Sequence, residues 1–297
     1  MMKSFGKVKQ LLTVFALLGM VMLLLGACSQ KPKKSGKIAI VTTTNVYSDI
    51  AQNVVGKYGK ADALIRNGAI DPHDFEPKTS DAKELSNADI VVANGLGYDS
   101  WMNQLASAVD KKPVFVGEDL LGLQKGANPH IWYDLDMPVK YVNYLVKRLS
   151  KLDPKHASYY HQNGQNYLRK VAHIKQIAAK IDGQNSKPVY ASEPVFDYAL
   201  AQAHLKVGNQ NFELAIQNDT DPSPEMVQEM TEKIKKREIA FFVNNSQASS
   251  ATVNNFIKLA KQHGVPVISV RETIPDNTTY LEWMNSNYQK LARVAEK

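Results

Sequence analysis

Short apolar runs alternate with amphipathic stretches along the first half of the chain. Residues 37–43 form a β-branched run that predicts a strand, and residues 46–55 follow with apolar positions at helical spacing. Further strands are expected at 61–65, 88–93 and 113–116. Strands that alternate with helices predict a parallel sheet covered by helices.

The same alternation begins again after residue 185. The expected strands are residues 188–191, 239–243 and 265–270, and the expected helices between them are residues 223–237 and 251–263. Ser223 followed by Pro224 is a typical helix start, and Gly264 is a typical helix stop. The second half is therefore predicted to be another parallel α/β unit.

A long helix is predicted between the two halves, over residues 153–183. Asp153 and Pro154 can begin it, Gly183 can end it, and apolar residues recur between them at steps of three and four. About 29 residues at 1.5 Å each predict a rod of about 43 Å. The predicted fold class is α/β, with an N-terminal lobe (37–152) and a C-terminal lobe (184–297) joined by this one long, rigid helix.

The first residues are typical of an export signal. Residues 1–10 carry three lysines and no acid, residues 11–25 are almost wholly apolar, and small residues precede Cys28. This last feature resembles a bacterial lipobox, which implies a signal peptide over 1–27, cleavage before Cys28, a lipid on its sulfur and a tether over 28–36. The competing interpretation is an uncleaved anchor with an incidental cysteine.

The composition excludes several classes of protein. Of 297 residues, 44% are hydrophobic and 22% are charged, which is not the balance of a disordered chain or a coiled coil. One cysteine cannot make an internal disulfide or a four-cysteine zinc site. The formal charge of +7 falls to +4 without residues 1–27, and four of the remaining lysines lie between residues 31 and 37. The folded part is therefore near neutral, and no nucleic-acid partner is expected.

Two motifs place a histidine directly after a proline, each in a stretch that follows a predicted strand. They are Asp71-Pro-His73-Asp-Phe-Glu-Pro77 and Asn128-Pro-His130-Ile-Trp-Tyr-Asp134. Proline restricts the local backbone, so each imidazole is held before a ligand arrives. Neutral imidazole is the commonest metal-binding side chain. The competing interpretation is that both are ordinary loop histidines.

Two carboxylates follow predicted strands of the second half, Glu193 and Asp276. Ligands of open α/β sheets bind at the carboxyl ends of strands. If the lobes face each other there, two imidazoles and two carboxylates come together in the cleft between them. Alternatively, Glu193 before Pro194 could be a helix N-cap.

With these motifs in place, the chain resembles the solute-binding lipoproteins of zinc- and manganese-type ABC importers, a family that includes lipoprotein receptor antigens once called adhesins. The resemblance covers residues 37–297. It is carried by the two Pro-His motifs, by Ser-Glu193 with Phe196 and Tyr198 beyond it, and by the closing Thr-Tyr280-Leu-Glu-Trp-Met.

The resemblance implies that His73, His130, Glu193 and an acid near residue 276 bind one metal ion between the lobes. Members of the family usually carry the last acid two residues before an aromatic residue, and that position is Thr278 here. Asp276 as the fourth ligand therefore requires a shifted loop, and Thr278 or water could take its place.

The ligand set ranks the metals that the site would carry. Two imidazoles with carboxylates suit Mn²⁺, although zinc stands above manganese in the general affinity order. We rank manganese first, zinc second and iron third.

The expected function is capture of a divalent metal, not catalysis. The expected partner is an ABC permease, and the expected state is a lipid-anchored monomer on the outer face of a bacterial cell membrane. The alternatives are a surface adhesin with a structural metal, and an extracytoplasmic metallo-hydrolase with Glu76 or Asp74 as the base.

Overall fold

The computed structural model describes residues 36–66, 75–248 and 250–295. The chain divides into two units, residues 1–37 and residues 38–297, and only Gly36 and Lys37 of the first are described. The predicted signal peptide, Cys28, His73 and Asp74 therefore lie outside the described residues. None of the described helices is both long and apolar enough to cross a membrane.

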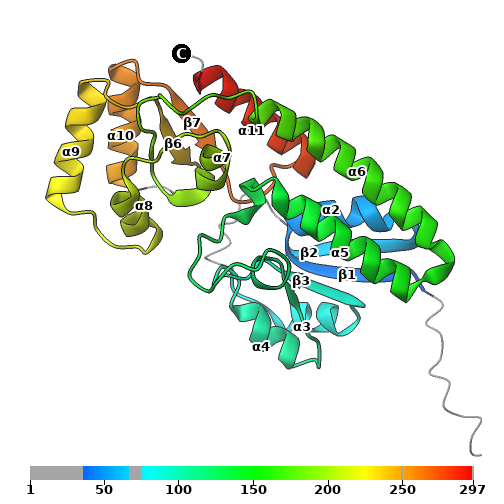
Figure 1. Cartoon of the computed structure of the whole chain (residues 1–297). Helices are drawn as coiled ribbons and strands as arrows, with labels where there is room; N and C mark the ends of the chain where they lie inside the picture. The colour runs from blue at the N-terminus through cyan, green and yellow to red at the C-terminus, as the bar shows by residue number, and fades with distance from the viewer. Residues whose placement is uncertain (1–35, 67–74, 249, 296–297) are drawn as a thin grey trace, which may run out of the picture. The chain divides into compact units, whose positions relative to one another are not determined.

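The N-terminal lobe is built on a four-stranded parallel sheet with the order β2-β1-β3-β4. Figure 1 labels the first three of these strands, with β1 between β2 and β3. All four strands lie where the apolar runs predicted them. They are β1 (Ile38–Thr44), β2 (Gly59–Ile65), β3 (Ile90–Ala93) and β4 (Val114–Phe115).

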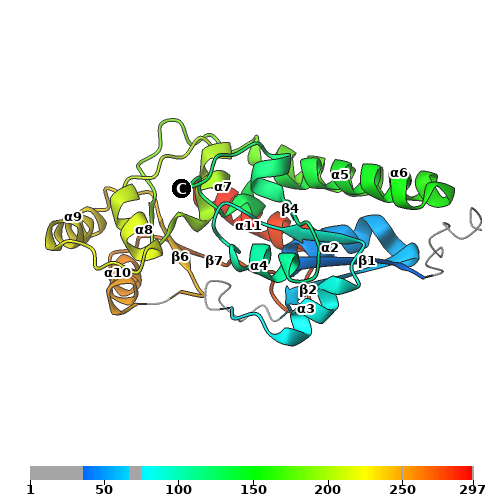
Figure 2. The same ribbon diagram turned by 90° about the horizontal axis from the view of Figure 1, so that it is seen from below.

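Helices cover both faces of this sheet. They are α2 (Asn45–Val55), α3 (Thr79–Ser86), α4 (Trp101–Ser107) and α5 (Asp136–Leu152). Ile40 and Val92 point to the side of α2 and α5, whereas Val41 and Val91 pack with α3 and α4. This follows from the alternation of side chains along a strand, and Figure 2 shows α3 and α5 on opposite sides of the strands. Short turns complete the lobe: η2 (Gly56–Tyr58), the π-turn η4 (Val116–Leu120) and η5 (Ile131–Tyr133).

The C-terminal lobe holds a three-stranded parallel sheet with the order β5-β6-β7. The strands are β5 (Tyr190–Ala191), β6 (Phe242–Asn245) and β7 (Val267–Val270). β6 lies further along the chain than the predicted 239–243. Its last residues, Asn244 and Asn245, pair with Ser269 and Val270. Apolar patterning could not mark these polar strand residues.

The helices of this lobe also lie on both faces of its sheet. They are α7 (Asp197–Gln202), α8 (Gln210–Gln217), α9 (Pro224–Lys235), α10 (Ala251–Gln262) and α11 (Tyr280–Ala295), with the turn η7 (Pro194–Phe196) before α7. The predicted caps of α9 and α10 are confirmed: Ser223 Oγ accepts from the Met226 N–H at 3.3 Å, and Gly264 has φ +69° just after α10. α8, α9 and α10 share one cluster of buried side chains with β6.

The long helix α6 joins the lobes and spans Ala157–Ala178. It is shorter than expected at both ends. Its entry is a 3₁₀ turn, η6 (Pro154–His156), and the Asp153 carboxylate binds the His156 ring and the Tyr160 hydroxyl at 2.6 and 2.8 Å instead of capping the backbone. Its buried face packs against α5 and α11, beside which it runs in Figure 1.

One continuous cluster of buried side chains extends through both lobes. Aromatic rings contact each other across the lobes in this cluster, because Tyr133 packs against both Phe196 and Trp283. Tyrosine side chains of the C-terminal lobe also donate hydrogen bonds to backbone carbonyls of the N-terminal lobe. The Tyr280 hydroxyl donates to the Trp132 carbonyl at 2.7 Å, and the Tyr288 hydroxyl donates to the Tyr133 carbonyl at 2.8 Å. The lobes are therefore joined by packing and hydrogen bonds as well as by α6.

Candidate metal-binding site

Polar side chains stand at the carboxyl end of every strand of the C-terminal sheet. Glu193 comes two residues after β5, Asn245 ends β6, and Glu272 comes two residues after β7. Because these parallel strands end at one edge of the sheet, the three side chains converge there.

Asn245 bridges the two carboxylates. Its Nδ2 donates to Glu193 Oε2 at 2.6 Å and to Glu272 Oε1 at 2.8 Å. Glu193 is only 8% exposed and Glu272 only 2%. One neutral amide offsets part of the repulsion between two buried carboxylates. A cation bound between them would offset it more completely.

The Glu193 side chain does not cap a helix, which was the alternative to a ligand role. Glu193 occupies the residue before η7, but its side chain makes no capping hydrogen bond. Its carboxylate is directed to Asn245, so the residue serves the polar edge of the sheet.

The N-terminal lobe contributes His130, which is 1% exposed. Its Nδ1 lies 2.7 Å from Asn128 Oδ1, which also accepts the His130 backbone N–H at 3.0 Å. An amide oxygen only accepts hydrogen bonds, so the imidazole carries its proton on Nδ1. The lone pair of the neutral ring is then on Nε2, the nitrogen that would bind a metal. The indole ring of Trp132 packs edge-on against this imidazole.

A buried asparagine after β3 fixes the segment that carries His130. Asn94 Nδ2 donates to the Pro129 carbonyl at 3.0 Å, and Asn94 Oδ1 accepts a short hydrogen bond from the Tyr47 hydroxyl. Asp99 accepts the backbone N–H groups of Asn94 and Gly95 at 2.6 and 2.9 Å. Burial raises the pKa of the Asp99 carboxyl, and these two donors act against that rise.

Hydrogen bonds link the histidine segment to the carboxylate edge. The Tyr98 hydroxyl donates to Glu272 Oε2 at 3.1 Å, and the Tyr98 ring lies 6.5 Å from that of His130. Asn128 Nδ2 donates to the Pro194 carbonyl at 2.7 Å, next to Glu193. These contacts place His130, Glu193 and Glu272 around one region between the lobes.

The four predicted ligands differ in where they lie. His130 and Glu193 are buried and meet at this region, and His73 is outside the described residues. Phe75, two residues after His73, packs its ring 4.9 Å from that of Trp101 in the N-terminal lobe. Asp276 is exposed in the turn before α11. Within the described ranges, no three His, Cys, Asp or Glu side chains are grouped closely enough to hold a metal ion.

Glu272 and Asn245 are two residues that the sequence analysis missed. Glu272 stands two residues after its strand, as Glu193 does, so the same rule applied to Val270-Arg-Glu272 would have found it. Asn245 gave no comparable signal, because it ends a strand whose polar residues were not expected to pair.

Two cavities open beside these residues. One, of about 600 Å³, is lined by Tyr98, Asn128, Asp197 and Glu213, among others. The other, of about 240 Å³, is lined by Glu193 together with the exposed Asp219 and Asp221. Acids at this second opening would favour the approach of cations to Glu193.

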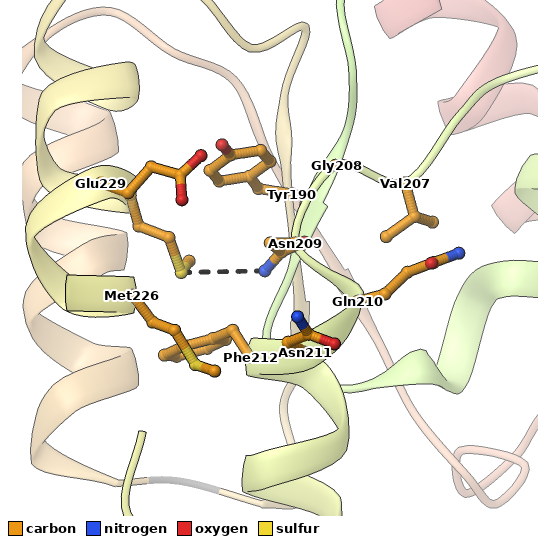
Figure 3. Close-up of a pocket in the computed structure, with 10 residues that line it drawn as sticks. Tyr190, Val207, Gly208, Asn209, Gln210, Asn211, Phe212, Met226 and Glu229 are labelled. Carbon is orange, nitrogen blue, oxygen red and sulfur yellow. Dashed lines mark hydrogen bonds between the residues drawn. The ribbon is translucent and has the colours of Figure 1, made fainter. Parts of the chain in front are cut away.

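A smaller pocket of about 230 Å³ in the C-terminal lobe has different chemistry (Figure 3). Amide and thioether groups line it, with Glu229 beside the Tyr190 ring. Asn209 lines this pocket and donates to Met230 Sδ at 3.8 Å and to the Ala191 carbonyl at 2.7 Å. None of the predicted ligands lines this pocket, so it is not the metal-binding site.

Comparison with known proteins identifies the class. A family model described as "Zinc-uptake complex component A periplasmic" matches residues 40–294, and the chain belongs to this family. The chain is a metal-binding, substrate-binding component of an ABC transporter and not an enzyme.

Individual relatives span nearly the whole chain. The chain is 27% identical to the metal ABC transporter substrate-binding lipoprotein SloC of Streptococcus mutans, over 95% of this chain and 96% of SloC. It is 26% identical to the manganese ABC transporter substrate-binding lipoprotein PsaA of Streptococcus pneumoniae, over 97% and 100%. It is 28% identical to the iron ABC transporter substrate-binding lipoprotein MtsA of Streptococcus pyogenes, over 83% and 84%.

Solved structures support the two-lobe α/β fold. The substrate-binding protein FpvC of Pseudomonas aeruginosa, in complex with Mn²⁺, superposes with a TM-score of 0.70 at 22% identity, over 88% of this chain and 98% of FpvC. The Zn(II)-bound ZnuA-like domain of Streptococcus pneumoniae AdcA gives a TM-score of 0.70 at 24% identity, over 88% and 100%. The predicted fold class is therefore confirmed.

Proposed function

We propose that this protein captures one Mn²⁺ ion between its lobes and delivers it to an ABC permease, with Zn²⁺ as the second candidate cargo. The observation that carries this proposal is the bridge from Asn245 to Glu193 and Glu272, which holds two carboxylates beside the His130 segment. Its relatives include one named for manganese and one for iron.

The proposed ligands are His73, His130, Glu193 and a fourth acid. The structure favours Glu272 over Asp276 for this position, because Glu272 is buried and shares Asn245 with Glu193, whereas Asp276 is exposed. Two carboxylates offer hard oxygen ligands, which suit Mn²⁺ better than an all-nitrogen set. Zinc would still bind in vitro, because affinity generally rises from manganese to zinc.

Metal capture would couple to the packing of the lobes. His73 and His130 belong to one lobe and the two acids to the other, so an ion bound by all four stabilises the arrangement that brings them together. The continuous core and the tyrosine hydrogen bonds across the lobes favour a small adjustment over a wide opening.

The chain would act at the outer face of the cell membrane. The relatives are lipoproteins, which supports cleavage after residue 27, a lipid on Cys28 and a tether over 28–36. The remaining chain would divide into an N-terminal lobe (37–152), a linking region (153–183) and a C-terminal lobe (184–297), and act as a monomer. Replacing Cys28→Ser should move the protein from the membrane fraction to the soluble fraction.

Metal capture is tested by titrating chelator-stripped protein with Mn²⁺. The binding is monitored by the electron paramagnetic resonance signal of free Mn²⁺ and by the melting temperature of the protein. We expect one tight ion per chain and a stabilisation of about 4 kcal/mol at a thousandfold excess over the dissociation constant. His73→Ala and His130→Ala should lose the tight ion and its stabilisation, whereas His161→Ala, on the exposed surface of α6, should keep both. A folded protein that binds neither Mn²⁺ nor Zn²⁺ would overturn the proposal.

A further inference from the structure

A second pair of acids lies near the proposed site, and the metal-binding set does not include it. Glu213 on α8 is 1% exposed, and Asp197 begins α7. The charge of Asp197 helps to raise the pKa of Glu213, so the two carboxyls lie within electrostatic reach. Both line the cavity of about 600 Å³.

Each of these carboxyls has a buried oxygen without a hydrogen-bond partner among the described residues, Asp197 Oδ1 and Glu213 Oε1. Asp197 and Glu213 differ in this respect from Glu193 and Glu272, which share the Asn245 amide as a donor. A buried polar atom left unpaired lowers stability. The apo protein therefore carries two acidic oxygens at this cavity whose missing partners a ligand can supply.

The rest of the cavity lining adds oxygen atoms that can bind a metal ion. One face of α8 presents Gln210, Glu213, Leu214 and Gln217 to the cavity, at the spacing of one helical face. Of the described residues that line the cavity, none is Lys, Arg, His or Cys. The available ligand atoms are thus carboxylate and amide oxygens, the set preferred by hard cations.

We propose that Asp197 and Glu213 form a second cation site, which takes a hard divalent cation such as Mn²⁺ or Ca²⁺ at this cavity. Two carboxylates match the charge of one divalent ion, and the cavity leaves room for water ligands. The site is weaker than the proposed imidazole site, because it has two protein carboxylates and no nitrogen ligand. It lies in the same interlobe region, because Asn128 and Pro194 line the cavity and are the neighbours of His130 and Glu193.

The protonation of the pair supports this assignment. Burial raises the pKa of Asp197 to about 6 and, together with the Asp197 charge, raises that of Glu213 to about 9. Near neutral pH the apo pair thus holds one proton in place of a cation, and the cation displaces it on binding.

The test counts bound ions in chelator-stripped protein by the electron paramagnetic resonance signal of free Mn²⁺, with Ca²⁺ as competitor. We expect two ions per chain for the unaltered protein, one for Glu213→Gln, one for His130→Ala and none for the double variant. Ca²⁺ should displace only the ion that His130→Ala retains, since calcium prefers oxygen ligands. Glu225→Gln, at an exposed acid of α9, should still bind two.

Two results would overturn the second site: a folded His130→Ala protein that binds no Mn²⁺, or a folded Glu213→Gln protein that still binds two ions. Asp197→Asn is the second variant if Glu213→Gln fails to fold. Failure of the proposed imidazole site has a different signature, because the unaltered protein and His130→Ala would then bind the same single ion, and Glu213→Gln would remove it.

Discussion

Two pairs of acids lie in the C-terminal lobe, and they differ in what compensates their charge. Glu193 and Glu272 stand at strand ends and share one amide nitrogen of Asn245. Asp197 and Glu213 stand on helices, and each has a buried oxygen with no hydrogen-bond partner in the described part of the chain. The first pair is positioned before any ion arrives, whereas the second is held together mainly by packing and protonation. Fixed geometry suits selective, tight capture, and the looser pair suits weak, exchangeable binding.

The largest effect is expected from removing one charge of the bridged pair. Glu272→Gln keeps the shape but loses a ligand charge, so Mn²⁺ affinity should fall by more than about 100-fold, beyond the loss typical of residues that only support ligands. Asp276→Asn is the matched control, four residues away on the exposed turn, and should change affinity less than about twofold. Isothermal titration of both variants checks this, and the opposite order would restore Asp276 as the fourth ligand.

Removing the bridge itself should have the next largest effect. Asn245→Ala leaves two buried carboxylates without their shared donor, which should lower apo stability by about 1–3 kcal/mol and Mn²⁺ affinity by about 10- to 100-fold. Saturating metal should restore most of the stability, because the ion replaces the lost donor. Asn244→Ala, the adjacent residue of β6 that points to the other face, should leave the affinity unchanged. Equal losses in the two variants would show that the bridge has no special role.

The histidine side of the site depends on orientation more than on charge. Asn128→Ala removes the acceptor that fixes the His130 ring, so affinity should fall about 10-fold or more. Asn128→Asp keeps the oxygen that faces His130 Nδ1 but loses the donor to the Pro194 carbonyl, so its affinity should lie between those of Asn128→Ala and the unaltered protein. If Asn128→Ala binds Mn²⁺ as well as the unaltered protein does, the orienting role is wrong.

The raised pKa of Glu213, in the pair with Asp197, should make the stability of the apo protein depend on pH. A carboxyl whose pKa is raised on folding binds more protons in the folded chain than in the unfolded one. Stability therefore falls as pH rises from the unfolded value of about 4.3 toward the folded pKa of Glu213, about 9. Glu213→Gln removes this loss, which amounts to at most about 4 kcal/mol at pH 7.

Melting temperatures measured in chelator at pH 5, 7 and 8.5 test this prediction. The unaltered protein should lose several degrees relative to Glu213→Gln across that range. Parallel curves for the two proteins would mean that Glu213 titrates as an ordinary surface carboxyl.

Much of the fold could be predicted because apolar runs mark buried parallel strands directly. All four N-terminal strands lie where those runs placed them, and the caps of α9 and α10 follow from Ser223 and Gly264. The start of α6 could not be predicted, because it depends on what Asp153 binds: its carboxylate takes the His156 and Tyr160 side chains, and the first turn becomes 3₁₀.

The placement of His130 and Glu193 in one buried region could be predicted, because each follows a recognisable strand or a Pro-His motif. Their role as ligands stays a prediction. Glu272 was within reach of the same rule, but Asp276 was the acid chosen after the last strand, even though alignment on Tyr280 points to Thr278. The roles of Asn245 and Glu213 depend on tertiary packing. An asparagine in a strand and a glutamate in a short helix are ordinary residues in a sequence, and only the fold places one between two acids and buries the other.

The most direct test of the central claim is anomalous diffraction from crystals of the Mn²⁺-loaded protein, measured on both sides of the manganese absorption edge. We expect a main peak within bonding distance of His130 Nε2 and of carboxylate oxygens of Glu193 and Glu272, with His73 completing the set. A main peak bonded to Asp276 and not to Glu272, or located away from both Glu193 and His130, would contradict it.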